Sequence, residues 1–322
     1  MSAPDMQELR RRAGSGDVAA LTLLGRKLLV GEGVAQAPAE ALACLRDASA
    51  RGGGEATSDL ALLAAWGVLR PRSFEAALDL LQRAAELGHP PAQAELRLLA
   101  GTGGADWAAL RRGVDPEAWT RARPARELSA APRIQVLEGF ASAAECDWLV
   151  ARGQGDLRRA RVYRHDASGH VESGNRTNTE SDYTVFRSDV VQALVRERIA
   201  ASIGADSRCF EVAKLLHYEP GQQFGLHADF ILPATPALAE DVRLHGQRVT
   251  TFLIYLNDDY QGGETEFPRI GLRYKGGKGD ALCFSNVDES GAPDQRSVHA
   301  GLPPASGVKW LYSQWVRSKP PG

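Results

Sequence analysis

Two spacings of apolar residues divide the chain. In residues 1 to about 105, Ala and Leu recur at helical intervals, three or four positions apart. After residue 133 the period changes, and beyond residue 210 short apolar runs alternate with Gly, Pro, Asn or Asp, as in strands joined by turns. The stretch between them is rich in Gly, Pro and Arg. We therefore expect a helical domain over residues 1–105, a linker over 106–132 and a second domain over 133–322.

The helical half repeats itself with a period of 36 residues. Three sets of positions keep this phase: Gly16, Gly52 and Gly88; Ala20, Ala56 and Ala92; Leu24, Leu60 and Leu96. A fixed period of this length predicts stacked helix pairs that bury their apolar faces only against neighbouring repeats. About two and a half repeats fit, and a generic Ala-rich helical bundle is the alternative. The first repeat has the turn sequence GEGV, of the pattern GxGV, at residues 31–34, whereas the middle repeat has GVLRPRS at the equivalent place. We therefore expect the loop of the middle repeat to differ.

The second half predicts a helix and a set of short strands. SAAECDWLVARG reads as a helix capped by Ser142, with Glu145 three residues on. The expected strands lie in RIQVLEGF, EVAKLLHY, RVTTFLIYL, GETEF, DALCFS and VKWLYSQWV. Many short strands at this spacing favour a sandwich or barrel of the jelly-roll type. The fold class predicted for the whole chain is therefore a two-domain α+β protein.

One segment of this strand region carries candidate metal ligands. YEPGQQFGLHADF places His227 and Asp229 two positions apart, so on a strand both side chains project from one face. His299, seventy residues after Asp229, supplies a third ligand and completes a set of two histidines and one carboxylate suited to Fe(II). An HxD tripeptide alone is weak evidence, since a surface histidine beside an acid gives the same letters.

A lysine follows the second histidine at a spacing that can place both on neighbouring strands. Lys309 lies ten residues after His299, and the turn PPASG between them allows its strand to run back beside that histidine. A lysine buried in a barrel is costly unless it is paired. A co-substrate carboxylate is its natural partner, and iron with a cation one small molecule away describes a site for 2-oxoglutarate.

These motifs resemble the prolyl 4-hydroxylase branch of the Fe(II)/2-oxoglutarate dioxygenases, from about Arg133 to Trp315. The resemblance implies a double-stranded β-helix with flanking helices, with Tyr218 hydrogen-bonding the co-substrate. In NRTNTE, Arg176 and Thr177 fit the family's segment near the substrate, which makes Arg176 a candidate substrate-binding residue; an exposed surface charge is the alternative. Separately, LLGRKLLVGEGVAQAPAEALACLRDASARG resembles a Sel1-like repeat, a relative of the tetratricopeptide repeat.

Two tryptophans near the end of the chain are interpreted as structural. Trp310 is expected to face away from the site, since it neighbours an inward Lys309 on a strand. Trp315 is interpreted as a core residue. The loop ILPATPALAEDVRLHGQ after Asp229 has no counterpart in the family pattern, and whether it closes over the site stays open.

The resemblance implies an enzyme that hydroxylates a residue in a peptide or protein, with proline as the favoured residue. The helical repeats are expected to help bind that peptide or protein. Fe(II), 2-oxoglutarate and O2 would be required, succinate and CO2 would be co-products, and ascorbate is a candidate reductant. Three alternatives stay open: the same chemistry on a free amino acid or other small molecule, a repeat adaptor with an inert barrel, and a zinc hydrolase.

Composition sets the remaining expectations. The formal net charge is −2, so the chain as a whole lacks the positive charge that would attract a nucleic acid. No apolar run is long enough to span a bilayer, and the N-terminus lacks the apolar stretch of a signal peptide. Four scattered cysteines without a CxxC pair are typical of a reducing compartment. We therefore expect a cytoplasmic protein with neither nucleic acid nor membrane as partner.

Overall fold

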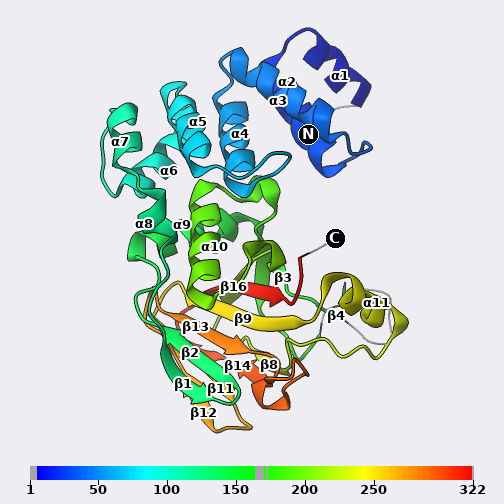
Figure 1. Cartoon of the computed structure of the whole chain (residues 1–322), viewed down its shortest axis with the longest axis vertical. Helices are drawn as coiled ribbons and strands as arrows, with labels where there is room; N and C mark the ends of the chain where they lie inside the picture. Colours follow the sequence, from blue (N-terminus) through cyan, green and yellow to red (C-terminus); the bar gives the residue numbers. More distant parts are fainter. Residues whose placement is uncertain (1–5, 164–169, 172, 321–322) are drawn as a thin grey trace. The chain divides into compact units, whose positions relative to one another are not determined.

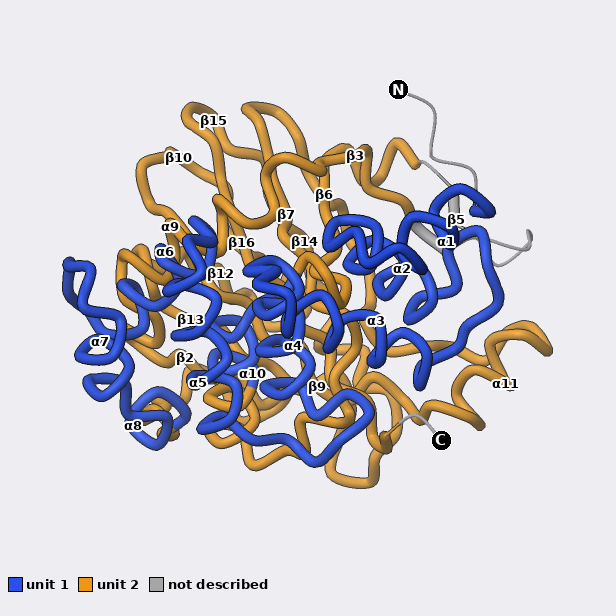
Figure 2. The backbone as a smooth tube through the Cα atoms, turned by 90° about the horizontal axis from the view of Figure 1, so that it is seen from above, with its two compact units in different colours: residues 1–120, 188–196 blue, residues 121–187, 197–322 orange. Residues whose placement is uncertain are grey.

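The computed structural model of the chain describes residues 6–163, 170–171 and 173–320. The chain separates into two compact units, which Figure 2 shows in different colours. Unit 1 takes the chain up to residue 120 together with 188–196, and unit 2 takes 121–187 and 197 onward. None of the helices in the described ranges combines the length and apolarity needed to cross a bilayer.

Unit 1 is a row of helices that pack on one another in chain order (Figure 1). They are α1 (Met6–Gly14), α2 (Val18–Val30), α3 (Pro38–Ala50), α4 (Gly54–Trp66), α5 (Phe74–Glu86), α6 (Pro90–Ala100), α7 (Trp107–Gly113) and α8 (Pro116–Thr120). A glycine precedes each of α2, α4 and α6, and its φ is positive in all three cases: +85° at Gly16, +88° at Gly52 and +80° at Gly88. Glycine adopts such values without steric cost. The alanines four positions later are at most 2% exposed. The predicted helical repeats are thereby confirmed.

The loop of the middle repeat keeps the backbone of the first. Gly31 and Gly67 both end a helix in the left-handed region, with φ of 77° and 70°. Two residues further on, Gly33 has φ of 69° and its equivalent Leu69 has φ of 59°. The predicted difference between the loops is therefore wrong at these two positions. Leu69 holds a conformation that a side chain makes unfavourable.

Replacing Leu69 by glycine should stabilise the protein. The left-handed backbone costs a non-glycine residue about 1–2 kcal/mol, and the extra freedom of glycine in the unfolded chain offsets about half of this. We expect a net gain of about 0.5–1 kcal/mol in the free energy of unfolding, measured by denaturant titration. Leu87, equally exposed but with φ of −76°, is the matched control, and Leu87→Gly should destabilise. A loss of stability in Leu69→Gly would contradict the argument.

Unit 2 contains two main antiparallel sheets (Figure 1). The larger has the order β1-β2-β13-β9-β16-β7-β6-β3 and the smaller the order β12-β11-β14-β8. Larger-sheet strands are β1 (Arg126–Ala130), β2 (Arg133–Leu137), β3 (Arg158–Arg159), β6 (Thr179–Asp182), β7 (Lys214–Tyr218), β9 (Arg248–Tyr255), β13 (Ala281–Ser285) and β16 (Lys309–Arg317). Smaller-sheet strands are β8 (Phe224–His227), β11 (Thr265–Phe267), β12 (Leu272–Tyr274) and β14 (His299–Gly301). Two short pairs complete the unit: β4 (Val162–Tyr163) with β5 (His170–Val171), and β10 (Gln261–Gly262) with β15 (Pro304–Ser306).

The core of unit 2 lies between these sheets. Phe267 of the smaller sheet meets Phe284 of the larger at a ring distance of 5.0 Å. The buried apolar cluster is formed by Ile134, Val136, Leu216, Tyr218, Leu253, Tyr255, Phe267, Leu282, Phe284 and Leu311. Every strand expected from the sequence is present, and the predicted α+β class with a jelly-roll domain is confirmed.

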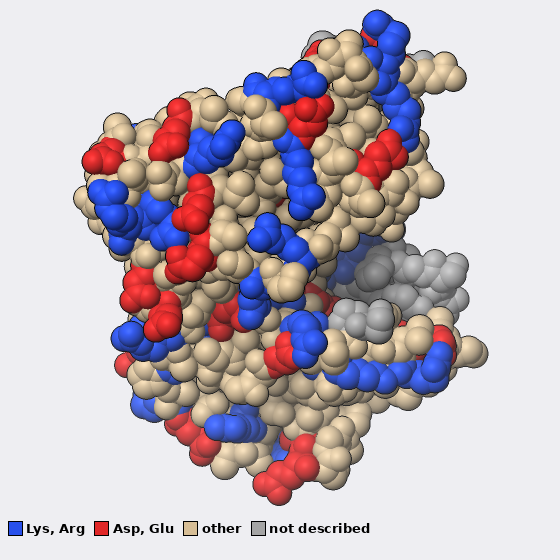
Figure 3. Space-filling model, turned by 45° about the horizontal axis from the view of Figure 1, so that its top comes forward, with Lys and Arg blue, Asp and Glu red and all other residues tan. Residues whose placement is uncertain are grey.

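Helices flank these sheets. They are α9 (Ala143–Gly153), α10 (Val190–Ile203), whose first turns cluster with unit 1, and α11 (Pro236–His245). The expected capping box of α9 is present, because Ser142 and Glu145 each accept the other's backbone N–H. On the face drawn in Figure 3, basic and acidic side chains are interspersed.

Candidate active site

The candidate metal ligands lie together on two paired strands. His227 ends β8 and His299 begins β14, and the two residues are direct antiparallel partners. Asp229 follows β8 by two residues and is 4% exposed. Asp229 Oδ1 is 3.6 Å from His227 Nε2, and its Oδ2 is 3.7 Å from His299 Nε2. These three residues form the one group of such ligands found among the described residues.

Hydrogen bonds fix which ring nitrogen of each histidine faces the site. His227 Nδ1 lies 2.9 Å from the carbonyl oxygen of Gly225, and His299 Nδ1 lies 3.0 Å from that of Ser297. A carbonyl can only accept, so both Nδ1 atoms carry the proton. In both rings Nε2 is therefore the nitrogen that faces Asp229 and is placed to ligate a metal.

The protonation states also suit a cation. Burial alone would raise the pKa of Asp229, but His299, His227 and the hydroxyl of Thr251 together hold it far below its usual range. Burial and the neighbouring His227 lower the pKa of His299 to about 4. A carboxylate and imidazole nitrogens are ligands that a divalent metal accepts, so the donor set of the three residues fits Fe(II).

A cavity runs from these ligands to Lys309. Its wall includes Asp229, His299, Tyr218, Thr265 and Lys309. Lys309 is fully buried, and its ammonium donates to the carbonyl oxygen of Gly263 at 2.6 Å. Among the described residues no carboxylate lies within 4.0 Å of it, and burial lowers its pKa to about 7. A buried ammonium without a counter-ion favours a ligand that brings a carboxylate.

Tyr218 lies beside this lysine. The two residues are direct partners on β7 and β16, and the lysine ammonium is 5.2 Å from the centre of the tyrosine ring. Tyr218 is 2% exposed and lines the cavity. Burial raises its pKa to about 12, which keeps its hydroxyl as a donor.

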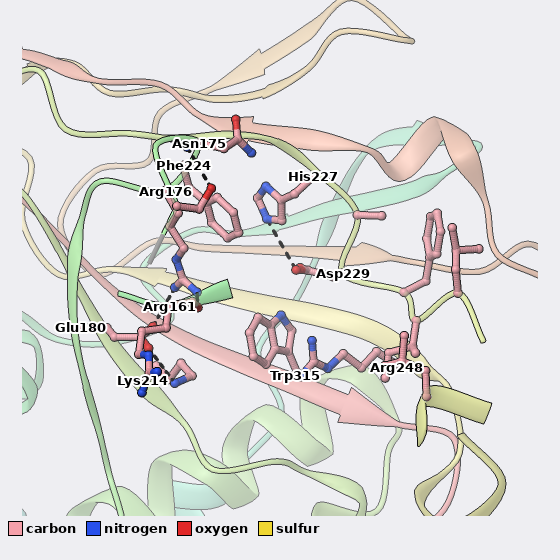
Figure 4. Close-up of a pocket in the computed structure, with 16 residues that line it drawn as sticks. Arg161, Asn175, Arg176, Glu180, Lys214, Phe224, His227, Asp229, Arg248 and Trp315 are labelled. Carbon is pink, nitrogen blue, oxygen red and sulfur yellow. Dashed lines mark hydrogen bonds and ion pairs between the residues drawn. The ribbon is translucent and has the colours of Figure 1, made fainter. Parts of the chain in front are cut away.

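Arg176 lies in the wall of the cavity and is 4% exposed, so the alternative of a surface charge is wrong. Its guanidinium pairs with Glu180 at 2.7 Å and also donates to Asn178 and to the backbone of Arg161. It lies 4.4 Å from the Phe224 ring, and that ring stacks on His227 at 3.4 Å. Figure 4, which draws a second, neighbouring cavity, shows Arg176, Phe224 and His227 in this order along one of its sides.

A second cavity of about 440 Å³ opens next to the ligands. Across it from Phe224 lie Trp315 and Arg248 (Figure 4), with the guanidinium 3.8 Å from the centre of the indole ring. Trp315 lines both cavities and is half-buried, so its interpretation as a core residue is wrong. Alternation along β16 could have found it, because Trp315 lies six residues after the inward Lys309. Trp310 packs against His217, with 4.2 Å between the ring centres, and lines neither cavity, as predicted.

The loop after Asp229 forms an ordered wall of this cavity. It contains α11, whose first turn is capped by the hydroxyl of Thr235. Asp241 pairs with Arg317 at 2.9 Å, which ties α11 to the end of β16. Ile231, Leu232 and Leu238 of this segment line the cavity beside the ligands. The segment thus contributes an apolar wall next to the metal ligands.

A jelly-roll with two histidines and an aspartate at one end of a cavity and a buried lysine at the other defines an Fe(II)/2-oxoglutarate-dependent dioxygenase. The model of the 2OG-Fe(II) oxygenase superfamily matches residues 213–317. Prolyl 4-hydroxylase 1 of Arabidopsis thaliana is 34% identical over 206 residues, which cover 60% of this chain and 71% of that protein. The chain belongs to this superfamily, in its prolyl 4-hydroxylase branch.

Solved structures are similar to each half of the chain. The viral collagen prolyl hydroxylase of Paramecium Bursaria Chlorella virus-1, in complex with 2OG, is 24% identical with a TM-score of 0.44, covering 58% of this chain and 96% of that one. A Sel1 repeat protein from Oxalobacter formigenes is 31% identical with a TM-score of 0.29, covering 34% of this chain and 88% of that one.

Proposed function

We propose that the chain hydroxylates a prolyl residue in a peptide or protein, with His227, Asp229 and His299 holding Fe(II). Lys309 and Tyr218 are proposed to bind the distal carboxylate of 2-oxoglutarate. The observation that carries this assignment is the shared cavity: one set of walls includes all three candidate ligands and a buried lysine without a counter-ion.

Bound iron supplies the oxidative chemistry, in which O2 and 2-oxoglutarate are converted to succinate, CO2 and a hydroxyl group on the substrate. The chain's own residues bind, orient and exclude water. Asp229 and His299 are each about 5% exposed, so their lone pairs are kept from bulk water. The Lys309 ammonium would leave the carbonyl of Gly263 for a carboxylate, a stronger, charge-assisted partner.

Proline in a peptide is the proposed substrate because the curated relatives are named as prolyl 4-hydroxylases. Trp315, Arg176 and the apolar wall of residues 231–238 surround the cavity beside the ligands and are proposed to contact that substrate. Arg176 would act mainly through its stack on Phe224, since Glu180 already neutralises its charge.

The helical repeats are proposed to contribute affinity for the protein substrate, because stacked repeats build extended binding surfaces. Deleting them is a poor test. Within unit 1, Glu95 accepts the backbone N–H of Val190 at 2.6 Å and of Val191 at 3.1 Å, and so caps the start of α10. A chain beginning at residue 121 would lose this cap.

The rival proposals differ in what they leave unexplained. A zinc hydrolase or an inert adaptor has no use for a buried lysine in the metal cavity that, among the described residues, has no carboxylate partner. A hydroxylase of free amino acids would use the same residues and is separated only by experiment. A reducing, cytoplasmic location is proposed from the four free cysteines, and ascorbate as a reductant rests on the resemblance alone.

The substrate class can be tested with the full chain, Fe(II), 2-oxoglutarate and isotopically labelled O2. Substrates are proline-rich peptides in one reaction and free proline in another. Mass spectrometry should find one labelled oxygen in the peptides, with matching succinate, and none in free proline. The Asp229→Ala variant is the control for uncatalysed oxidation. Labelled free proline with unlabelled peptides would contradict the peptide proposal while leaving the dioxygenase chemistry in place.

A further inference from the structure

Behind the proposed metal site, buried hydrogen bonds hold the aspartate. The Thr251 hydroxyl donates to Asp229 Oδ2 at 2.6 Å, and the Asn286 amide nitrogen donates to the same hydroxyl at 2.9 Å. Thr251 lies in β9 and Asn286 just after β13, so this connection joins neighbouring strands of the larger sheet. Thr251 is 1% exposed and Asn286 is fully buried.

The direction of each bond in this connection is determined. A carboxylate that ligates a metal can only accept, so the single proton of the Thr251 hydroxyl points to it. That hydroxyl can then only accept from Asn286, and an amide nitrogen can only donate. The connection therefore fixes the rotation of the carboxylate and occupies Oδ2, while Oδ1 faces His227.

The same asparagine is also connected to the second histidine. The backbone carbonyl oxygen of Asn286, not its side chain, accepts the backbone N–H of Asp294 at 3.0 Å. The carbonyl oxygen of Asp294 accepts both the backbone N–H (3.0 Å) and the hydroxyl (2.7 Å) of Ser297. The carbonyl oxygen of Ser297 in turn accepts from His299 Nδ1 at 3.0 Å. Asn286 thus stands between two ligands that are seventy residues apart in the sequence.

We propose that Thr251 and Asn286 are positioning residues for the metal, whose side chains hold the Asp229 carboxylate in the orientation that ligation needs. This inference rests on the proposed metal site. It assigns a task to two buried polar side chains that have no other role in the proposed mechanism. Such hydrogen bonds behind a metal ligand typically change metal affinity about 10- to 100-fold when they are removed.

The test measures the affinity of the metal-free full chain for Mn(II) by titration calorimetry, with no turnover involved. Thr251→Val removes the hydroxyl and keeps the shape, and Thr251→Ser keeps the hydroxyl. Thr250→Val is the matched control, because Thr250 is the adjacent residue of β9 and points to the opposite face. Asn286→Ala breaks the connection one step further back and serves if Thr251→Val does not fold.

We expect Thr251→Val to weaken Mn(II) binding about 10- to 100-fold, with Thr251→Ser and Thr250→Val within about threefold of the wild type. Asn286→Ala should weaken it several-fold. A merely structural role would instead lower the melting temperature of the metal-free chain and leave the Mn(II) affinity of the folded protein unchanged. Wild-type affinity in Thr251→Val, or in Asn286→Ala where the first does not fold, would overturn the inference.

The wild type and His299→Ala separate this result from a failure of the metal site itself. If the wild type binds no Mn(II), or His299→Ala binds it as tightly, the proposed site is wrong. If the wild type binds and His299→Ala does not, an unchanged Thr251→Val refutes only the positioning role.

Discussion

His299→Ala should abolish 2-oxoglutarate turnover and lower the affinity for divalent metal by at least about 100-fold. The reason is geometric, because His299 is buried and provides one of three ligands, with its Nε2 fixed by the bond from Nδ1 to Ser297. Succinate release and metal titration measure the two effects. His227→Ala and Asp229→Ala should behave in the same way.

His217→Ala is the matched control for these variants. His217 also lies on a strand of unit 2, but it packs against Trp310 and lines neither cavity. Its removal should leave metal affinity and turnover near the wild-type values. Turnover at the wild-type rate in His299→Ala would show that the triad assignment is wrong.

Lys309→Met should raise the KM for 2-oxoglutarate at least about tenfold, since a charge-assisted contact contributes about 1.5–3 kcal/mol. Metal affinity should change little, because Lys309 is not a ligand. Lys278→Met, which removes a partly exposed lysine paired with Asp147 and outside both cavities, is the control. Equal loss of metal and co-substrate binding would point to collapse of the fold instead.

Lys309→Met should also alter how the free energy of unfolding depends on pH. The folded pKa of Lys309, about 7, is below its unfolded value of 10.5, so the unfolded chain binds more protons between these values. Lys309 therefore makes the metal-free protein more stable as the pH rises from 7 to 10.5. Lys309→Met should lose this rise. Affinity of the wild type for 2-oxoglutarate should fall as the pH rises above 7, because the carboxylate needs the ammonium form.

Local sequence patterns predicted the strands that carry the site and the candidate ligands on them. The alternation of apolar residues identified the strands, and the spacing of His227, Asp229 and His299 identified residues that the fold brings together. The repeat period was readable because its glycines occupy left-handed turns. The left-handed conformation of Leu69 could not be predicted in this way, because its backbone is set by the repeat architecture rather than by its own residue type.

What the sequence missed depends on contacts between distant segments. Trp315 looks like a core aromatic until the strand is counted from Lys309. The helix α11 begins within a Pro-rich loop and is held by an ion pair from Asp241 to Arg317, 76 residues away. The bond between Thr251 and Asn286 spans 35 residues, and no motif marks either residue.

The most direct test of the central claim is a crystal structure of the full chain grown with Mn(II) and 2-oxoglutarate in the absence of O2. Anomalous scattering locates the metal without reference to any assumed site. We predict one strong anomalous peak bonded to His227, Asp229 and His299, with the far carboxylate of 2-oxoglutarate against the Lys309 ammonium. Metal bound elsewhere, or a lysine still on the carbonyl of Gly263 while 2-oxoglutarate occupies another place, would contradict the account.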